Sequence, residues 1–355
     1  MFSEIELELK NKCQFDQLSW INLKTPLTVE FYEKWLSRNH YGTMDYLQSH
    51  LPIKKDPTLL NSNFKSVITV THHYFPSPSP LADSLPARTA LYSKNNDYHF
   101  WLKDKLNISI ELLKQKFPND LFAPFVDSGP LLEKDYAYQA GHGWFGKNTC
   151  LIHPEKGSFF FIAEILTTLE IQKNESSFIT LNPHPDMCGT CTRCMDICPT
   201  QALISPREMK ADQCIAYFNI ESKSIPPIEF RKKMNDWFFG CDLCQSVCPW
   251  NEKFFRDQKI EQSNDTSTTE ILHLTSEEKT ELFEFYKMIL TSSNKQLQKR
   301  FHGTALFRAS GFGLKRNALI VIANRKILGL ESEIKNLQKD QKLTELCDWT
   351  LAQLN

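Results

Sequence analysis

Eight of the eleven cysteines lie within residues 188–248, and their spacing is typical of iron–sulfur ligands. The first four follow the pattern Cys-x2-Cys-x2-Cys-x3-Cys-Pro. A second run repeats its last three cysteines and its proline, with the leading cysteine moved back to Cys214. In chains with two such clusters, the fourth cysteine of each run binds the other cluster. The predicted ligands are therefore Cys188, Cys191, Cys194 and Cys248 for one [4Fe–4S] cluster, and Cys198, Cys214, Cys241 and Cys244 for the other.

Two zinc sites or a disulfide framework are the alternative explanations of these cysteines. Zinc needs neither the closing Cys-Pro nor a crossed fourth ligand. The N-terminal residues contain no apolar signal core and no twin arginine, so we expect a reducing cytoplasm, where disulfides are rare. No apolar run approaches the roughly 20 residues that a helix needs to span a bilayer, so no membrane segment is expected.

Asp127 is a candidate catalytic carboxylate. Residues 121–127 read as a short apolar strand that ends in this aspartate and opens into a Ser-Gly-Pro turn, where a carboxylate is well placed to face a cleft. The alternative is that Asp127 caps a helix over residues 131–140. Residues 141–148 carry three glycines in six positions, which permits close backbone approach to a bulky ligand. Their spacing fits neither a dinucleotide-binding fingerprint nor a P-loop.

The elements that must position these residues alternate along the first half of the chain. Residues 29–36 and 97–117 have apolar side chains at helical spacing, whereas residues 63–75 and 158–167 are rich in strand-forming residues. This alternation favours a layered α/β or α+β sandwich. We predict an α+β chain with an α/β cofactor-binding catalytic domain at 1–175, a ferredoxin-like double-cluster domain at 176–258 and a helical, basic region at 259–355.

The clearest charge signal lies in residues 285–330. This stretch has nine Lys or Arg residues and no Asp or Glu, although the net charge of the chain is only −1. A local basic surface attracts phosphate backbones, and a solvated helical face is the plainer alternative. Residues 259–280 are polar and read as a linker. Together these features indicate a redox enzyme with two clusters, an unassigned cofactor or substrate and a basic C-terminal surface.

The sequence resembles the cobalamin-dependent epoxyqueuosine reductases over nearly its whole length. Besides the eight cysteines, the motifs that carry the resemblance lie at residues 35–47, 64–68, 97–99, 126–129, 140–149, 157–166 and 303–318. The resemblance implies the last step of queuosine synthesis, in which the epoxide on the cyclopentane ring of epoxyqueuosine, at the wobble position of certain tRNAs, is reduced to a cyclopentene. It further implies that a small donor protein of the flavodoxin or ferredoxin type feeds electrons through the two clusters to cobalamin.

The resemblance also makes Asp127 the proton donor for the leaving epoxide oxygen. An aspartate has an unperturbed pKa of about 3.9, so it would have to be buried beside apolar groups to stay protonated near neutrality. We expect residues 122–126 and the corrin face to supply that burial.

Cobalamin contacts carry over from the family motifs, with two departures. Lys54 stands where the family usually has arginine, and the two cations are not equivalent donors. Ala216 stands in a motif that more often begins Ile-Ser, so a hydroxyl is missing there. The implied contacts are Lys54, Tyr98, His99, Asp127, Asn148, Leu151, Ile162, Ile165 and Ala216.

Phosphate contacts with tRNA are expected at basic side chains of the C-terminal stretch and near the clusters, and the protein is expected to be a monomer. The alternatives are a reductive dehalogenase, which shares cobalamin and two clusters, and a non-catalytic electron-transfer protein. Dehalogenases are usually exported with a twin-arginine signal, which this sequence lacks. The expected tRNA contacts are Arg308, Lys315 and Arg316, with Lys223, Arg231 and Lys232 as secondary candidates.

Overall fold

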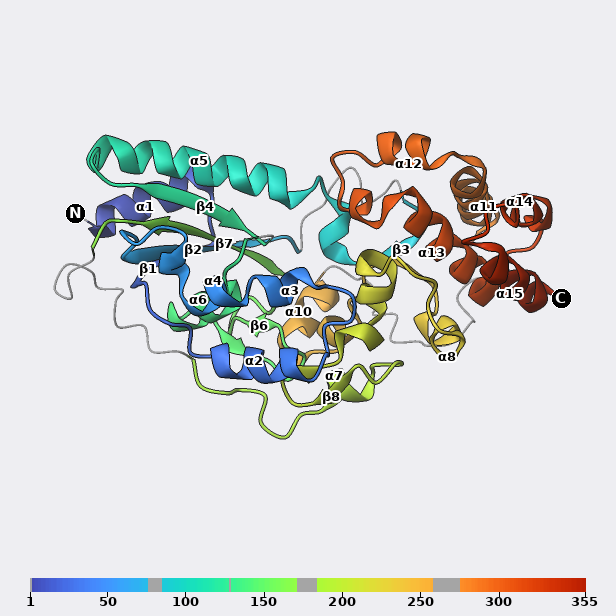
Figure 1. Ribbon diagram of the computed structural model, residues 1–355, viewed down its shortest axis with the longest axis horizontal. Helices are drawn as coiled ribbons and strands as arrows, with labels where there is room; N and C mark the ends of the chain where they lie inside the picture. Colours follow the sequence, from blue (N-terminus) through green and yellow to red (C-terminus); the bar gives the residue numbers. More distant parts are fainter. Residues whose placement is uncertain (1, 76–84, 128, 171–183, 258–274) are drawn as a thin grey trace.

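The computed structural model describes residues 2–75, 85–127, 129–170, 184–257 and 275–355. The molecule is elongated, with a sheet near the N-terminus at one end and a group of helices near the C-terminus at the other (Figure 1). Helices and strands are both present, which confirms the predicted α+β class. The predicted linker at 259–280 lies mostly outside the described residues. None of the described helices is both long enough and apolar enough to span a bilayer.

A four-stranded sheet forms the centre of the N-terminal half. Its order is β1-β2-β7-β4, and each neighbouring pair is antiparallel. The two central strands are rich in β-branched and aromatic residues and are almost entirely buried, because helices cover both faces of the sheet. The strands span Gln17–Asn22 (β1), Ser66–His73 (β2), Phe122–Val126 (β4) and Phe160–Thr167 (β7).

Helices α1 (Phe2–Cys13) and α5 (Tyr98–Lys116) cover one face of this sheet (Figure 1). The Asp97 side chain caps α5 by accepting the backbone N–H of His99 at 3.0 Å. The cap places Tyr98 and His99 in the first turn of the helix, at the edge of the sheet. The predicted helix at 97–117 is therefore confirmed.

The opposite side of the sheet carries shorter helices. Helix α6 (Glu133–Gln139) packs against β2 and β7. Helix α2 confirms the helix predicted at 29–36, and it contacts α4, which precedes a short 3₁₀ turn. These elements span Val29–Ser37 (α2), Tyr46–Ser49 (α3), Leu51–Lys55 (α4) and Pro57–Leu59 (η1).

The glycine-rich residues 141–148 form part of a small hairpin. Strand β5 (Trp144–Phe145) pairs with β6 (Leu151–Ile152). Gly143 has a φ of 154°, and a Cβ at this position would clash with the carbonyl oxygen of Ile152. This glycine is therefore needed for the close approach of two backbone segments, rather than for approach to a ligand.

The two cysteine runs form short, similar turns that contact each other. Helix α7 (Arg193–Asp196) lies in the first run and α9 (Leu243–Ser246) in the second. Between them lie the hairpin of β8 (Leu203–Ser205) and β9 (Glu208–Met209) and a π-helical turn, η4 (Tyr217–Glu221). Helix α10 (Pro249–Asp257) follows the second run, and its Phe255 packs into the core beneath the sheet.

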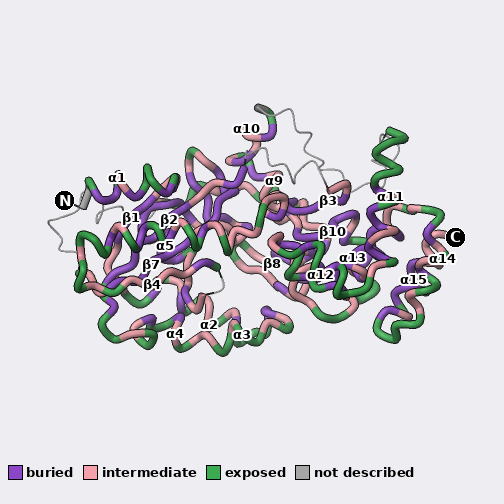
Figure 2. The backbone as a smooth tube through the Cα atoms, turned by 90° about the horizontal axis from the view of Figure 1, so that it is seen from above, coloured by how far each residue is buried: buried purple, intermediate pink, exposed green. Residues whose placement is uncertain are grey.

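The C-terminal helices surround α13, which is buried over most of its length (Figure 2). A capping box of Thr275 with Glu278 is present at the start of α11. The elements span Ile228–Arg231 (α8), Trp237–Phe239 (β10), Ser276–Thr291 (α11), Asn294–Arg300 (α12), Ala305–Ala309 (η7), Ser310–Arg325 (α13), Glu331–Leu337 (α14) and Thr344–Leu354 (α15).

The largest core draws on all three predicted domains. Strand β10 pairs in parallel with β3 (Arg88–Thr89), a segment from the first predicted domain. Ala87, Phe238 and Leu319 belong to one continuous apolar cluster. The predicted boundary at 258 therefore does not separate two independent cores, since residues on both sides of it bury each other.

Candidate active site

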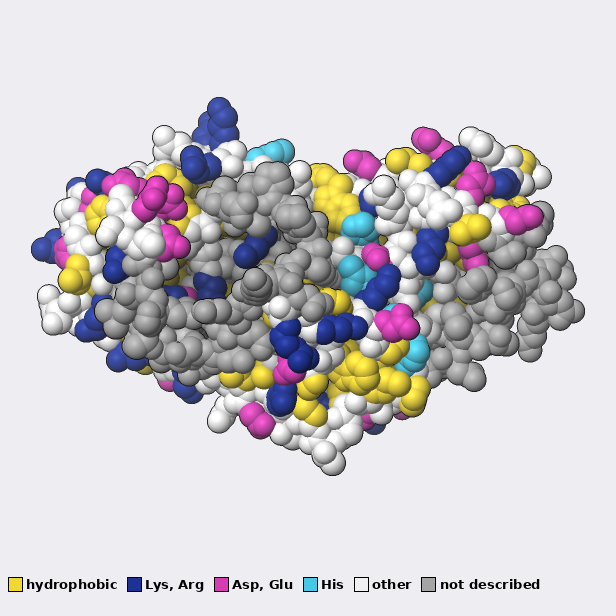
Figure 3. Space-filling model, turned by 180° about the vertical axis from the view of Figure 1, so that it is seen from behind, with side chains coloured by type: hydrophobic (Ala, Val, Ile, Leu, Met, Phe, Trp, Pro, Cys, Tyr) yellow, Lys and Arg dark blue, Asp and Glu magenta, His cyan; other side chains and the backbone are white. Residues whose placement is uncertain are grey.

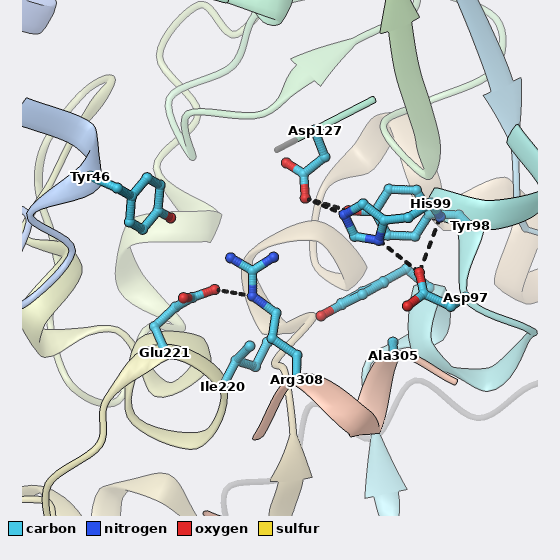
Figure 4. Close-up of a pocket in the computed structure, with 10 residues that line it drawn as sticks. Tyr46, Asp97, Tyr98, His99, Asp127, Ile220, Glu221, Ala305 and Arg308 are labelled. Atoms are coloured by element: carbon cyan, nitrogen blue, oxygen red, sulfur yellow. Dashed lines mark hydrogen bonds and ion pairs between the residues drawn. The ribbon is translucent and has the colours of Figure 1, made fainter. Parts of the chain in front are cut away.

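Asp127 lies where strand β4 ends, and its side chain points into a cavity (Figure 4). Its backbone φ is 51°, a left-handed conformation that aspartate tolerates in tight turns. Helix α6 begins at Glu133 with Leu132 at its N-cap position, so Asp127 does not cap this helix. The Asp127 carboxylate instead contacts the start of α5.

Tyr98 and His99 both contact the Asp127 carboxylate. The Tyr98 hydroxyl donates to Asp127 Oδ2 at 2.5 Å, and His99 Nε2 lies 3.3 Å from the same oxygen. His99 Nδ1 lies 2.7 Å from Asp97 Oδ1, so the imidazole is held between two carboxylates (Figure 4). The Tyr98 and His99 rings stack with their centroids 4.2 Å apart. These contacts fix the orientation of the whole network.

The exchangeable proton of this network resides on His99. Partial burial lowers the pKa of His99, but its hydrogen bonds with Asp127 and Asp97 raise the pKa by more, to about 9. Partial burial raises the pKa of Asp127, but hydrogen bonds from His99 and Tyr98 lower it by more, to about 2. At neutral pH an imidazolium therefore lies between two carboxylates.

The expectation that burial raises the pKa of Asp127 is therefore wrong in direction. The Asp127 side chain is 48% exposed, so it keeps much of its solvation. Burial is the largest single influence on its pKa, but the hydrogen bonds from His99 and Tyr98 and the charges of His99 and Arg308 together outweigh it.

The cavity in front of Asp127 has a volume of about 160 Å³, and on its opposite side lies an ion pair (Figure 4). Arg308 Nε, on η7, is 2.9 Å from Glu221 Oε1, on η4. Arg308, expected as a phosphate contact, lines this cavity. Glu221 was not among the predicted site residues, and no motif indicates it. The lining residues are Tyr46, Tyr92, Asp97, Tyr98, His99, Asp127, Ile220, Glu221, Ala305 and Arg308.

Two glutamates and a lysine form a buried cluster next to the Asp127 turn. Glu164, on the central strand β7, is fully buried, and neither of its oxygens meets a donor among the described residues. It lies within hydrogen-bonding reach of Glu133, whose carboxyl also accepts the backbone N–H of Asp127. Lys54, expected at cobalamin, is buried beside them and donates to the Leu131 carbonyl oxygen at 2.7 Å. A charged residue inside the apolar run of β7 is the sequence signal for this cluster.

The glutamate pair retains a proton at neutral pH. Burial raises the pKa of Glu133 to about 8 and raises that of Glu164 well above its ordinary value. The unfolded chain loses this proton near pH 4.5, so folding becomes less favourable as the pH rises from there to about 8. The free energy of unfolding should fall across this range by up to about 1.4 kcal/mol per pH unit.

We expect Glu164→Gln to flatten this fall in stability, because the amide offers Glu133 a hydrogen-bond donor that does not titrate. Urea unfolding of the wild type and the variant at several pH values measures the effect. Glu111→Gln, at an exposed position on α5, is the matched control. An unchanged pH dependence in the Glu164 variant would contradict the shared proton.

The structure brings thiols from the two cysteine runs close to one another. Cys248, at the end of the second run, is a neighbour of Cys188, and Cys214 and Cys241 both have Cys198 as a neighbour. Burial and these neighbours raise the pKa of Cys248 to about 12. Among the described residues, no three His, Cys, Asp or Glu side chains group as ligands of a single ion.

The loop after β5 holds both cysteine runs. Lys147 Nζ donates to the carbonyl oxygens of Gly189 at 2.6 Å and Cys191 at 2.9 Å. Asn148 Nδ2 donates to the carbonyl oxygen of Cys244 at 3.1 Å. Asn148, expected at cobalamin, is buried and its amide is bonded to a cluster turn. The motif that contains these residues therefore joins the sheet to the double-cluster region.

The remaining expected cobalamin contacts divide between two faces of the sheet. Ile165 is 1% exposed and packs in the core under α1 and α5, so its side chain does not reach the Asp127 cavity. Ile162 is half-buried on the other face, beside Leu151. It also adjoins Asp127, because Val126 pairs with the next residue of β7. Ala216 is half-buried directly before η4.

Two expected tRNA contacts are corrected by their burial. Arg316 is fully buried, and its guanidinium donates to the carbonyl oxygens of Ser222 and Ser224 and to the Asn317 side chain. Arg231 is 4% exposed and forms two 2.8 Å hydrogen bonds with Glu345. Both guanidiniums hold the fold together and are not available to phosphate.

The other basic candidates remain accessible. Lys223 and Lys232 are exposed, and Lys315 is half-buried. On the face shown in Figure 3, Lys and Arg side chains are interspersed with Asp and Glu rather than gathered in one patch. Part of the positive charge at 285–330 is therefore used in structural contacts such as those of Arg316 and does not form a basic surface.

The fold and the site define an oxidoreductase that combines a double-cluster region with an acid-bearing cavity. A family model described as "4Fe-4S double cluster binding domain" matches residues 187–251, and one described as "Epoxyqueuosine reductase QueG, DUF1730" matches residues 54–128. The chain belongs to the epoxyqueuosine reductase family. The epoxyqueuosine reductase of Leadbetterella byssophila is 41% identical over 249 residues, which cover 67% of this chain and 79% of that protein.

Further relatives agree with this assignment. The epoxyqueuosine reductase of Escherichia coli is 32% identical over 296 residues, covering 82% of this chain and 73% of that protein. A crystal structure of an epoxyqueuosine reductase with an epoxyqueuosine-modified tRNA-Tyr stem loop superimposes with a TM-score of 0.81. Its sequence identity is 24%, and the match covers 99% of this chain and 90% of that chain. These findings favour the reductase over a dehalogenase or a non-catalytic electron-transfer protein.

Cobalamin and two [4Fe–4S] clusters are the cofactors of this family. The residues near the end of β4 fit a corrin, because half-buried Ile162 adjoins the Val126 partner Ala163 on β7 and offers an apolar side chain there. Ile162, Leu151 and Tyr138 form one apolar cluster, which supplies a surface of the kind that a large ring requires. The crossed thiol sets fit two cubanes.

Proposed function

We propose that this chain reduces epoxyqueuosine in tRNA to queuosine. The observation that carries the proposal is the Asp127–His99–Asp97 network, a proton source at the wall of a cavity in a double-cluster protein of this family. In the reaction both C–O bonds of the epoxide break and a C=C bond forms. Two electrons and two protons are consumed, and the oxygen leaves as water.

Asp127 and His99 act together as the acid in this proposal. An epoxide oxygen that departs as an alkoxide is a poor leaving group, so a proton must reach it as the bond breaks. His99 stores that proton, and Asp127, 3.3 Å away, passes it to the oxygen. Tyr98 donates to the same carboxylate oxygen and keeps it facing the cavity. Asp97 fixes the orientation of the imidazole through its contact with His99 Nδ1.

The cofactors define what surrounds this acid. When bound, cobalamin supplies a strongly reducing cobalt centre, and the clusters deliver electrons to it. Ile162 and Leu151 would contact the corrin, and the thiol sets would hold the cubanes. The electron donor is a small one-electron carrier of the flavodoxin or ferredoxin type. We place the reaction of the monomeric protein in the cytoplasm, because a reducing compartment preserves thiolate ligands.

Binding of tRNA is proposed to use the exposed lysines rather than the buried arginines. We expect Lys232→Glu and Lys315→Glu, combined, to weaken binding of the tRNA about tenfold at low salt and to reduce its salt dependence. Lys103→Glu, at an exposed position on α5, should leave binding unchanged. Fluorescence anisotropy at several salt concentrations measures both quantities. An affinity equal to that of the wild type would remove these two lysines from the interface.

Expression in a bacterial strain that lacks its own epoxyqueuosine reductase tests the proposed function. Mass spectrometry of tRNA nucleosides should find queuosine when this chain is present and epoxyqueuosine when it is absent. Accumulation of epoxyqueuosine alone, despite soluble protein carrying iron, would contradict the proposal.

A further inference from the structure

Glu221 and Arg308 form the side of the cavity that faces the acid. Glu221 ends a π-helical turn, a local irregularity that is frequent at functional sites. Arg308 Nε lies 2.9 Å from Glu221 Oε1. The Glu221 side chain is 24% exposed and that of Arg308 is 40% exposed, so both can reach a bound molecule. Figure 4 shows the terminal nitrogens of Arg308 directed toward the space between Tyr46 and Asp127.

The charged groups of the described lining do not balance. Three carboxylates and two cations line the cavity, which leaves a net charge of −1 when His99 holds its proton. The rings of Tyr46 and Tyr92 face the same space, and aromatic faces attract cations. A ligand with one positive charge would therefore neutralise the net charge of this cavity. The carboxylates are Asp97, Asp127 and Glu221, and the cations are His99 and Arg308.

Epoxyqueuosine carries a cation in the matching place. Its cyclopentane ring is joined to the 7-deazaguanine base through a secondary amine, which is protonated at neutral pH. The amine nitrogen is bonded directly to the ring that bears the epoxide. A ring that presents its epoxide oxygen to Asp127 therefore directs its ammonium away from Asp127. Figure 4 shows Glu221 across the cavity from Asp127, where that ammonium would lie.

We propose that Glu221 binds the secondary ammonium group of the substrate side chain, with Arg308 orienting the carboxylate. This inference rests on the proposed function, because it names how the same cavity recognises its substrate. Asp97 and Asp127 are already paired with His99, whereas Glu221 is paired with an arginine that still exposes its outer nitrogens. The contact makes the site selective for a wobble base that carries an alkylamine over plain guanine.

The test compares three anticodon stem-loops that differ at the wobble base: guanine, 7-aminomethyl-7-deazaguanine and epoxyqueuosine. Their affinities for the reconstituted holoenzyme are measured by anisotropy without reductant, so no turnover is needed. Glu221→Gln should weaken binding of the two amine-bearing loops about tenfold and leave the guanine loop unchanged. Glu221→Asp, which keeps the charge, should retain most of the preference. Glu229→Gln, at an exposed position on α8, is the control.

Two outcomes would overturn the proposal. An equal loss for all three loops would make Glu221 and Arg308 a general RNA contact, and no loss for any loop would exclude contact with the ammonium. Failure of the proposed function gives a different pattern. In that case the wild type would bind the amine-bearing loops preferentially yet form no queuosine when reductant is added.

Discussion

Asp127→Asn is expected to lower the single-turnover rate constant for queuosine formation by about 10²–10⁴-fold, the usual contribution of a positioned general acid. Asparagine preserves the size of the side chain and can still accept the hydrogen bond from Tyr98. It cannot take a proton from His99 and pass it on. The variant should therefore bind cobalamin, iron and tRNA as the wild type does. Rapid mixing of reduced enzyme with epoxyqueuosine tRNA, followed by nucleoside mass spectrometry, measures the rate constant.

Two further variants sharpen this prediction. Asp104→Asn changes an exposed aspartate on the same helix as His99 and should have no effect. His99→Asn leaves Asp127 in place but removes the stored proton, so turnover should fall and lose its dependence on a group of pKa about 9. A near-normal rate constant in Asp127→Asn would remove Asp127 as the acid. Loss of cobalamin or tRNA binding would instead assign it a structural role.

Pairs of cysteine substitutions should have the second large effect, because they distinguish the crossed from the uncrossed assignment. Cys188→Ala with Cys248→Ala removes two ligands of one cluster in the crossed assignment, so about four of the eight irons should remain. Cys188→Ala with Cys214→Ala damages both clusters, so nearly all the iron should be lost. Turnover should vanish in both double variants, because the chain of electron carriers is broken.

Iron analysis and electron paramagnetic resonance after reconstitution measure these losses. Cys13→Ala, in the core under the sheet, should keep both clusters and is the control. In the uncrossed assignment both pairs remove one ligand from each cluster, so Cys188→Ala with Cys248→Ala would also lose nearly all the iron. That result would contradict the thiol groups seen in the structure.

The features that follow from local spacing were predictable from the sequence. Cysteine separations set which thiols share a turn, and the exchange of the fourth ligand between two such runs anticipates the grouping of Cys248 with Cys188. The start of α5 follows from the Asp97 cap, and the end of β4 follows from the change in residue type at Asp127. The α5 cap and the end of β4 depend on residues within a few positions of one another.

The features that depend on distant partners were not predictable. The pKa of Asp127 is set by His99, 28 positions earlier in the chain, and its direction reverses the expectation from apolar neighbours. Arg316 looks like a surface cation in the sequence, yet it bonds the carbonyl oxygen of Ser222, more than ninety residues away. Glu221 enters the cavity because η4 packs against η7. No periodicity of one segment encodes such contacts.

The pH dependence of a single turnover tests the central claim, that this chain reduces epoxyqueuosine with a proton held by the His99–Asp127 pair. Reduced holoenzyme is mixed under anaerobic conditions with a smaller molar amount of epoxyqueuosine tRNA, so that each enzyme turns over at most once. Queuosine is quantified at each pH. The rate constant should be steady around neutrality and fall as the pH rises through about 9, where His99 loses its proton. A rate constant that rises across this range, or the absence of queuosine at every pH, would contradict the account.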